Sequence, residues 1–253
     1  MLARTNYFVG WDVGGWNCDN NPKSRDAIVI LDNNQNLVGK PWRGNLRELI
    51  NDSRDPVTLV KNLLEYCCIS VSKSDPSALL AIDIPLGFSK PLIDLLTHGV
   101  TAGPIGTANS NPYLHRQTEF FLFKNGKHPL SPIKDMIGSQ ATKGMHILNQ
   151  CGLARKECGV WSDENCLTAI ETYPSACKNS QLINTMIASL KDKNRSDFAN
   201  IFEDQPDIFD ALICAFVAWL YSYSPKELAH PPAFIDPIEG WVFAPRDSLT
   251  ALE

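Results

Sequence analysis

Several features that would place the chain in a specialised class are missing. No stretch approaches eighteen consecutive apolar residues, and residues 1–6 lead directly into a predicted strand without the apolar segment of a secretory signal. The sequence contains no internal repeat and no low-complexity segment. We therefore expect a cytoplasmic protein with no membrane segment.

An excess of positive charge is also missing. The formal net charge of -5 argues against a protein that coats nucleic acid non-specifically through its phosphates. The charge is unevenly distributed, because residues 116–156 contain seven Lys or Arg and only two acids. A local basic surface is therefore compatible with the acidic total.

The usual metal-binding patterns of cysteine and histidine are missing too. The series Cys151, Cys158, Cys166 and Cys177 has gaps that match no zinc ribbon or knuckle, and the five histidines show no ligand spacing. Cys67, Cys68 and Cys214 fall in apolar helical patterns typical of small buried side chains. A metal or redox role for those four stays open.

What remains is the composition of an ordinary globular protein, with 44% hydrophobic and 20% charged residues. The predicted elements, in chain order, are strands at 7–12, 26–31 and 37–42, a helix opening at Asp55-Pro56, strands at 77–84 and 166–173, and helices through 182–186 and at 206–223. This order predicts a single α/β domain over residues 1–253. Its core is a five-stranded mixed sheet flanked by helices, with an irregular, partly helical insertion at 89–165 lying over it.

Acidic side chains stand at the ends of two predicted strands. Asp12 closes the first strand just before Gly14-Gly15, and Asp83 closes the strand at 77–84. A right-handed crossover would make these strands adjacent and parallel, so both acids would reach one crevice. Asp207 and Asp210 share a helix face that can cover it. Oxygen ligands of this kind favour Mg²⁺ or Mn²⁺, although an Asp at a strand end can also cap its own turn.

A resemblance rests on several short motifs. They are Gly10-Trp11-Asp12-Val13-Gly14-Gly15, Ala81-Ile82-Asp83-Ile84-Pro85-Leu86-Gly87, Arg116-Gln117-Thr118-Glu119, Ile170-Glu171-Thr172-Tyr173-Pro174, Asp207-Ile208-Phe209-Asp210-Ala211-Leu212 and Glu239-Gly240-Trp241-Val242. The acidic motifs resemble the signature of the ribonuclease-H-like superfamily, and the helix at 206–223 resembles its Holliday-junction-resolvase branch. Over nearly its full length the chain resembles domain-of-unknown-function family 429, whose members are predicted nucleases of that fold.

The resemblance implies a metal-dependent nuclease that hydrolyses phosphodiester bonds of RNA or DNA by a two-metal mechanism. It implies that Asp12, Asp83 and Asp210 hold the metals, with Asp12 bridging them, and that Glu171 or Asp207 completes the set of metal ligands. Arg116 and Glu119 on the insertion are expected to grip a phosphate, and Gly14 and Gly15 to contact substrate. Neighbouring phenylalanines (Phe120, Phe121 and Phe123) suggest a stacking surface for single strands.

Other interpretations remain open at this stage. Arg116 and Glu119 can form a plain ion pair, Glu171 can accept from a backbone amide near Pro174, and Asp207 can be a solvated acid at a helix start. The rival functions are a non-catalytic nucleic-acid or metabolite-binding protein of the same fold and an actin-like or sugar-kinase-like phosphotransferase. The sequence does not determine the oligomeric state.

Overall fold

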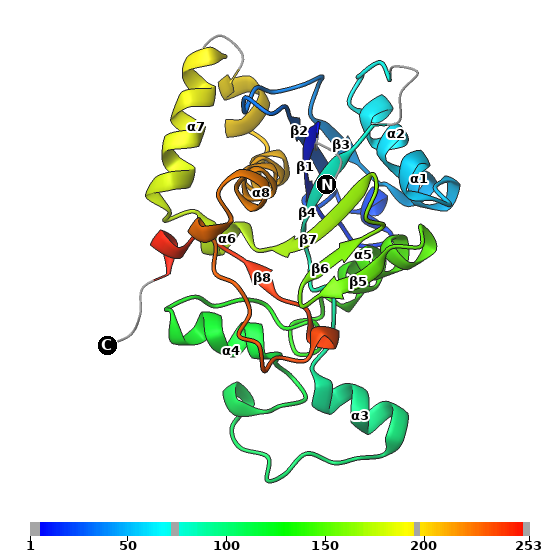
Figure 1. The fold of residues 1–253 in the computed structure, drawn as a ribbon, viewed down its shortest axis with the longest axis vertical. Helices are drawn as coiled ribbons and strands as arrows, with labels where there is room; N and C mark the ends of the chain where they lie inside the picture. Colours follow the sequence, from blue (N-terminus) through cyan, green and yellow to red (C-terminus); the bar gives the residue numbers. More distant parts are fainter. Residues whose placement is uncertain (1–5, 72–75, 195–197, 250–253) are drawn as a thin grey trace.

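The computed structural model of the protein describes residues 6–71, 76–194 and 198–249. It is an α/β structure with one open, mixed sheet between two layers of helices (Figure 1). Among the described helices, none is long and apolar enough to cross a membrane.

The strands of the sheet run in the order β3-β2-β1-β4-β7-β6-β5. Their bounds are β1 (Tyr7–Asp12), β2 (Asp26–Leu31), β3 (Trp42–Gly44), β4 (Ala78–Asp83), β5 (Ala154–Glu157), β6 (Val160–Ser162) and β7 (Leu167–Thr172), and the short β8 (Val242–Phe243) pairs with the end of β7. Strands β1, β4 and β7 are parallel, whereas β2 and β3 on one side and β6 and β5 on the other are antiparallel. The predicted meander and crossover are therefore present.

The prediction of five strands was wrong. Strands β5 and β6 form a hairpin inside the segment expected to be an irregular insertion, and β8 lies in the tail, for which no strand is predicted. The sequence of β5, Ala-Arg-Lys-Glu, shows no apolar alternation because this edge strand is largely exposed. The third strand was also placed too early, since Leu37 makes a single bridge to Leu31 and β3 begins at Trp42.

Helices cover both faces of the sheet. They are α1 (Arg47–Asp52), α2 (Pro56–Tyr66), α3 (Lys90–His98), α4 (Gln117–Lys124), α5 (Gly138–Gln150), α6 (Pro174–Cys177), α7 (Gln181–Lys193) and α8 (Pro206–Tyr223). Figure 1 shows α7 and α8 on one side of the sheet and α1 and α2 on the other. Helix α2 begins as predicted, with Asp55 accepting a hydrogen bond from the Thr58 amide at 2.8 Å and Pro56 in the first turn.

Two hydrophobic cores result from this layering. On β1, Phe8 packs toward α7 and α8, whereas Val9 and Trp11 pack toward α1, α2 and α5. Strand β4 alternates in the same way, with Leu79 and Ala81 on the α8 face. Because strand side chains alternate with period two, the face on which each terminal residue projects is fixed by its position in the strand.

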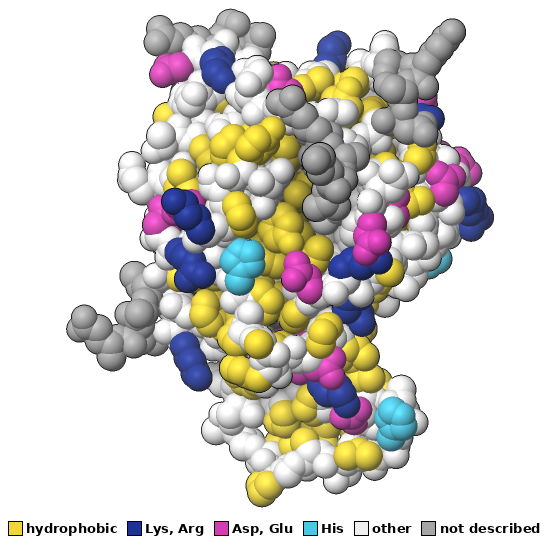
Figure 2. All heavy atoms as spheres, in the orientation of Figure 1, with side chains coloured by type: hydrophobic (Ala, Val, Ile, Leu, Met, Phe, Trp, Pro, Cys, Tyr) yellow, Lys and Arg dark blue, Asp and Glu magenta, His cyan; other side chains and the backbone are white. Residues whose placement is uncertain are grey.

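The insertion contributes unequally to these cores. Helix α5 packs into the core under α1 and α2, whereas α3 has no buried residue. Figure 2 shows hydrophobic side chains gathering at the end of the molecule where Figure 1 places α3, and Leu96 there is 75% exposed. On the rest of this face, acidic and basic side chains are interspersed.

Candidate functional site

Asp12 and Asp83 stand side by side at the carboxyl ends of β1 and β4. They are direct partners in the parallel register of the two strands. Phe8 and Leu79 lie on the α8 face, and both acids follow them at even spacing, so both carboxyl groups project toward α8. The two carboxyl groups share a hydrogen bond. The sequence therefore predicted correctly that these two acids meet.

Helix α8 reaches the acid pair because Gly10 allows close contact with β1. A Cβ atom added at Gly10 would lie 1.9 Å from the Ala211 carbonyl oxygen and 2.4 Å from the Ala215 nitrogen. Only a glycine permits this approach of helix backbone to strand. The first turns of α8 carry Asp207 and Asp210, and the charge of each raises the pKa of Asp12.

Burial and repulsion between acids raise the pKa values of Asp12 and Asp83. Burial is the largest cause that raises the pKa of Asp12 well above its ordinary value, followed by the charges of Asp83 and Asp210. Burial and then Asp210 raise the pKa of Asp83 to about 7. Near neutral pH the Asp12–Asp83 pair therefore retains a shared proton, which a cation could replace.

The two acids of α8 have cationic partners. Lys178, just after α6, places its Nζ 2.8 Å from Asp210 Oδ1. This contact is an ion pair without good hydrogen-bond geometry, because the buried Oδ1 has no hydrogen-bond partner among the described residues. Asp207 Oδ2 accepts from Arg43 Nε at 2.7 Å and from the Arg25 amide at 3.1 Å. The interpretation of Asp207 as a solvated acid was therefore wrong.

A small pocket of about 160 Å³ opens over the acid pair. Its wall includes Asp12, Asp83 and Tyr173, together with Ile137 and Gln140 from the region of α5. Within the described part of the chain, no three His, Cys, Asp or Glu side chains are grouped closely enough to hold a metal ion. The expected shell of three or four protein ligands is therefore not assembled in this structure.

Glu171 lines the same pocket as Asp12 and Asp83 but approaches it from the other face of the sheet. In the β4–β7 register Glu171 pairs with Ile82, and Asp83 pairs with Thr172. This offset of one residue turns Glu171 to the other face of the sheet. Its Oε1 and Oε2 accept from Arg116 at 2.6 and 2.9 Å, and the Leu86 amide donates to Oε2 at 2.9 Å. Glu171 thus anchors the insertion to the sheet.

Arg116 is buried at the centre of that anchor, with 1% of its side chain exposed. Its Nε and Nη2 donate to Glu119, its Nη1 and Nη2 to Glu171, and its Nη1 also to the Glu239 carbonyl oxygen. All five guanidinium hydrogens are therefore used inside the protein. Arg116 and Glu119 therefore hold Glu171 in place while they line the pocket over Asp12 and Asp83, and their contact with a phosphate stays a prediction.

Three of the sequence motifs meet in this network. The carboxylate of Glu239 accepts from the Lys90 amide at 2.9 Å and from the Gln117 amide at 2.7 Å, which caps the starts of α3 and α4. The Val242 amide donates to Thr118 at 3.0 Å. The motifs around Arg116, Glu171 and Glu239 therefore form one buried connection between the insertion, β7 and the tail.

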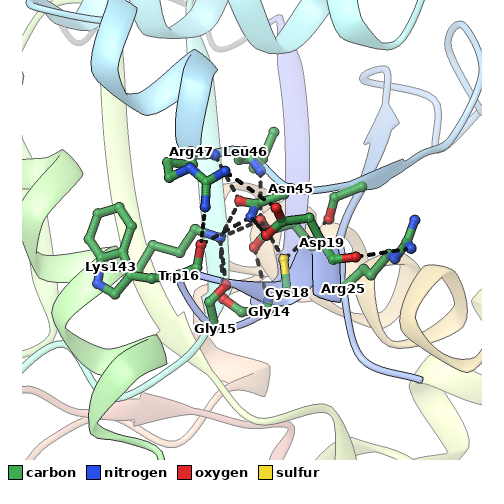
Figure 3. Close-up of polar contacts among 12 residues, drawn as sticks. Gly14, Gly15, Trp16, Cys18, Asp19, Arg25, Asn45, Leu46, Arg47 and Lys143 are labelled. Carbon is green, nitrogen blue, oxygen red and sulfur yellow. Dashed lines mark hydrogen bonds and ion pairs between the residues drawn. The ribbon is translucent and has the colours of Figure 1, made fainter. Parts of the chain in front are cut away.

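The glycine turn after Asp12 is tied to Lys143 of α5. Figure 3 shows the Lys143 ammonium reaching the Gly14 and Gly15 carbonyl oxygens, at 3.3 and 3.4 Å, and it also pairs with Asp26. The Gly14 amide donates to Asp26 Oδ1 at 2.9 Å. The Gly14 amide and the two carbonyl oxygens thus have partners within the protein, and a substrate contact of Gly14 and Gly15 stays a prediction.

The remaining sequence expectations fall into two groups. The cysteines at 151, 158, 166 and 177 are buried, and the absence of a metal-binding group among described residues includes them. All three phenylalanines are partly exposed; Phe121 packs on Trp241 with ring centroids 4.9 Å apart, whereas Phe120 and Phe123 contact His115. A stacking surface for single strands stays a prediction.

Sequence reasoning assigned no role to Lys143, Asp26 or Lys178, nor to Tyr173, although Tyr173 lies in one of the quoted motifs. One signal was present for Lys143, because it lies four residues before Ile147 and so on the buried stripe of α5. Lys178 follows a short helix and lies in no motif.

Comparisons with known proteins add nothing to this description. The chain matches no family model, no curated protein and no solved structure.

Proposed function

We propose that the protein is a divalent-metal-dependent hydrolase that cleaves phosphodiester bonds of nucleic acid. The observation that carries the proposal is the contact between Asp12 and Asp83 at the ends of two parallel strands. Acids are costly to bury side by side, and their raised pKa values measure that cost. A bound cation would remove it.

The donors at this position fit Mg²⁺ or Mn²⁺. All of them are carboxylate oxygens, which hard divalent cations prefer. Mg²⁺ is commonly held by one or two carboxylates while it keeps several waters. Asp12 and Asp83 would hold the ion, and the buried Oδ1 of Asp210, which lacks a hydrogen-bond partner among described residues, supplies a further acceptor nearby.

The residues around the pair support phosphoryl chemistry. A divalent cation bound there supplies an activated water and stabilises negative charge on phosphoryl oxygens. Lys178 brings a positive charge to the same group of acids, since it pairs with Asp210 and lowers the pKa of Asp83. Because Lys178 and Arg43 already neutralise the two acids of α8, the contacts favour one cation at Asp12 and Asp83 over two.

The proposal extends to the fold family. The portion β3-β2-β1-β4-β7 has three antiparallel strands followed by two parallel ones, with α8 over the strand ends. We propose on this basis that the chain has a ribonuclease-H-like fold. The extra strands β5, β6 and β8 extend this core at the β7 edge.

Metal binding is the first test. Calorimetric titration with Mn²⁺ at pH 8 is expected to detect one site in the wild-type protein and none in Asp12→Asn or Asp83→Asn. The matched control is Asp52→Asn, which changes an exposed acid on α1 and should bind Mn²⁺ as the wild type does.

Cleavage is the second test. Single-stranded, duplex, branched and RNA substrates are incubated with Mg²⁺ or Mn²⁺ and each of the four proteins. We expect cleavage by the wild type and Asp52→Asn alone. Metal binding without cleavage of any substrate would favour a non-catalytic binding protein, and equal cleavage by all four proteins would exclude the assignment.

A further inference from the structure

A second, larger cavity lies beside the pocket that contains Asp12 and Asp83. It has a volume of about 730 Å³ and is bounded by α4, the single turn of 3₁₀ helix Ala108–Ser110, and the segment 128–135. Pro129 and Leu130 line both cavities, so the two share a wall. We refer to the larger cavity as the α4 groove.

Two aromatic rings form one side of the α4 groove. Phe120 and Phe123 are three residues apart on α4, so both project from one helix face. The ring of His115 packs edge-on against both, with centroids 5.8 and 5.1 Å away. His115 is 2% exposed, and burial lowers its pKa, which keeps it an uncharged support for the two rings.

The charge of the α4 groove is opposite in sign to that of the whole chain. Lys124, His128 and Lys134 line it, and Asp135 is the acid among its lining residues. Lys134 and Asp135 form a loose ion pair at 3.9 Å. Lys124 is exposed and forms no ion pair with another described residue. The lining therefore has a positive excess in a chain whose net charge is -5.

We propose that the α4 groove binds a single-stranded segment of nucleic acid and leads it to the Asp12–Asp83 pocket. Bases would stack on Phe120 and Phe123, and phosphates would lie against Lys124 and Lys134. The volume of about 730 Å³ is that of a pocket for a ligand the size of one or two nucleotides, whereas the pocket of about 160 Å³ admits little more than a phosphate group. This inference rests on the proposed function.

The groove selects single strands over duplexes for a geometric reason. Rings at the side of a groove can stack only on bases whose faces are free, and in a duplex those faces are covered by neighbouring bases. A physical link also joins groove and pocket, because the Tyr173 hydroxyl in the pocket wall donates to the His128 carbonyl oxygen at 3.2 Å.

The test measures binding apart from cleavage. Fluorescence anisotropy is recorded in EDTA with a labelled twelve-nucleotide single strand, as DNA and as RNA, and with the matching duplex. The variants are Phe123→Ala, Lys124→Glu and Lys134→Glu. The control is Lys226→Glu, a charge reversal at a side chain that is 86% exposed.

The wild type is expected to bind at least one single strand more tightly than the duplex. Each groove variant is expected to weaken that binding roughly tenfold, and the lysine variants should also reduce its salt dependence. Because Lys124 and Lys134 are at the surface, their variants keep the test valid even if Phe123→Ala fails to fold. No binding by the wild type, tighter binding to duplex, or unchanged binding by both lysine variants would overturn the inference.

Failure here can be separated from failure of the proposed function. Asp12→Asn should bind the single strand as the wild type does in EDTA, and Lys124→Glu should bind Mn²⁺ as the wild type does. Cleavage that requires Asp12 but ignores Lys124 and Lys134 would retain the proposed function and reject the groove. If binding of the single strand requires both lysines but Asp12 has no role in cleavage, the groove is retained and the proposed function is rejected.

Discussion

Two groups of acids near the end of β1 differ in how their charges are compensated, one fully buried and the other half-buried. Asp26 and Lys143 are both fully buried, and the Asp26 carboxylate also accepts from Trp11 Nε1 and from the Gly14 and Leu46 amides. Asp12 and Asp83 have each other as hydrogen-bond partner, and neighbouring acids raise the pKa of both. In the first group the charges of Asp26 and Lys143 balance each other and the Asp26 oxygens accept hydrogen bonds. In the second group the negative charges are not balanced by a basic side chain paired with Asp12 or Asp83.

The difference separates architecture from function. The Asp26–Lys143 pair fixes α5 to the turn after β1, and every donor it needs is supplied by the chain. The Asp12–Asp83 pair costs stability as it stands, because two acids share a poorly solvated position. Sites that retain such a local conflict are commonly functional, and three substitutions and one addition of metal can test the contrast.

The largest effect is expected from Lys143→Met. It leaves the fully buried Asp26 without its cation, so the free energy of unfolding should fall by about 3–5 kcal/mol. Urea denaturation at pH 7 measures this change. The double variant Asp26→Asn/Lys143→Met removes the stranded charge and should recover part of the loss. A loss below about 1 kcal/mol in the single variant would contradict the structural role.

Asp83→Asn should act in the opposite direction and stabilise the protein at pH 8 by on the order of 2 kcal/mol. In the folded protein the pKa of Asp83 is raised from 3.8 to about 7. The folded state therefore retains a proton that the unfolded chain releases, and stability is lost as pH rises from 3.8 through about 7.

The measurement is urea denaturation of both proteins at several pH values. The wild type should lose stability relative to Asp83→Asn across that window, and the difference should level off above it. Asn can still donate a hydrogen bond to Asp12, so the substitution isolates the charge. Parallel pH profiles for the two proteins would show that Asp83 is not strained by burial.

Mn²⁺ should stabilise the wild type by a smaller amount. At ten times the dissociation constant the gain is about 1.4 kcal/mol, which raises the melting temperature by roughly 3–5 °C. Scanning calorimetry at pH 8 should show this shift in the wild type and in Asp52→Asn but not in Asp12→Asn. An equal shift in all three proteins would place the ion elsewhere.

Lys178→Gln should have the smallest effect. The Lys178 side chain is 45% exposed, so losing its pair with Asp210 should change the free energy of unfolding by less than about 1 kcal/mol. The substitution also removes a charge that lowers the pKa of Asp83. The pH range over which the protein loses stability through Asp83 should therefore extend to higher pH. A shift of that range to lower pH would contradict the closeness of Lys178 to Asp83.

Much of the core was predictable because its signals are local. The alternation in β1 and β4, the capped start of α2 and the apolar α8 each depend on neighbouring residues. The hairpin of β5 and β6 was missed because its polar edge strand has the composition of a loop. The face of Glu171 was also missed, since it depends on a one-residue difference in register that no local pattern reveals.

The sequence by itself determined that Asp12 and Asp83 would meet. Two apolar strands joined by a right-handed crossover lie side by side, and period-two alternation then directs the acids at their ends to the same face. Only the tertiary structure decided which acids are neutralised. Asp26 pairs with Lys143, 117 residues further along the chain, and Glu171 pairs with Arg116. Such pairing depends on how distant segments pack. Among the described residues, it leaves Asp12 and Asp83 without an ion pair to a basic side chain.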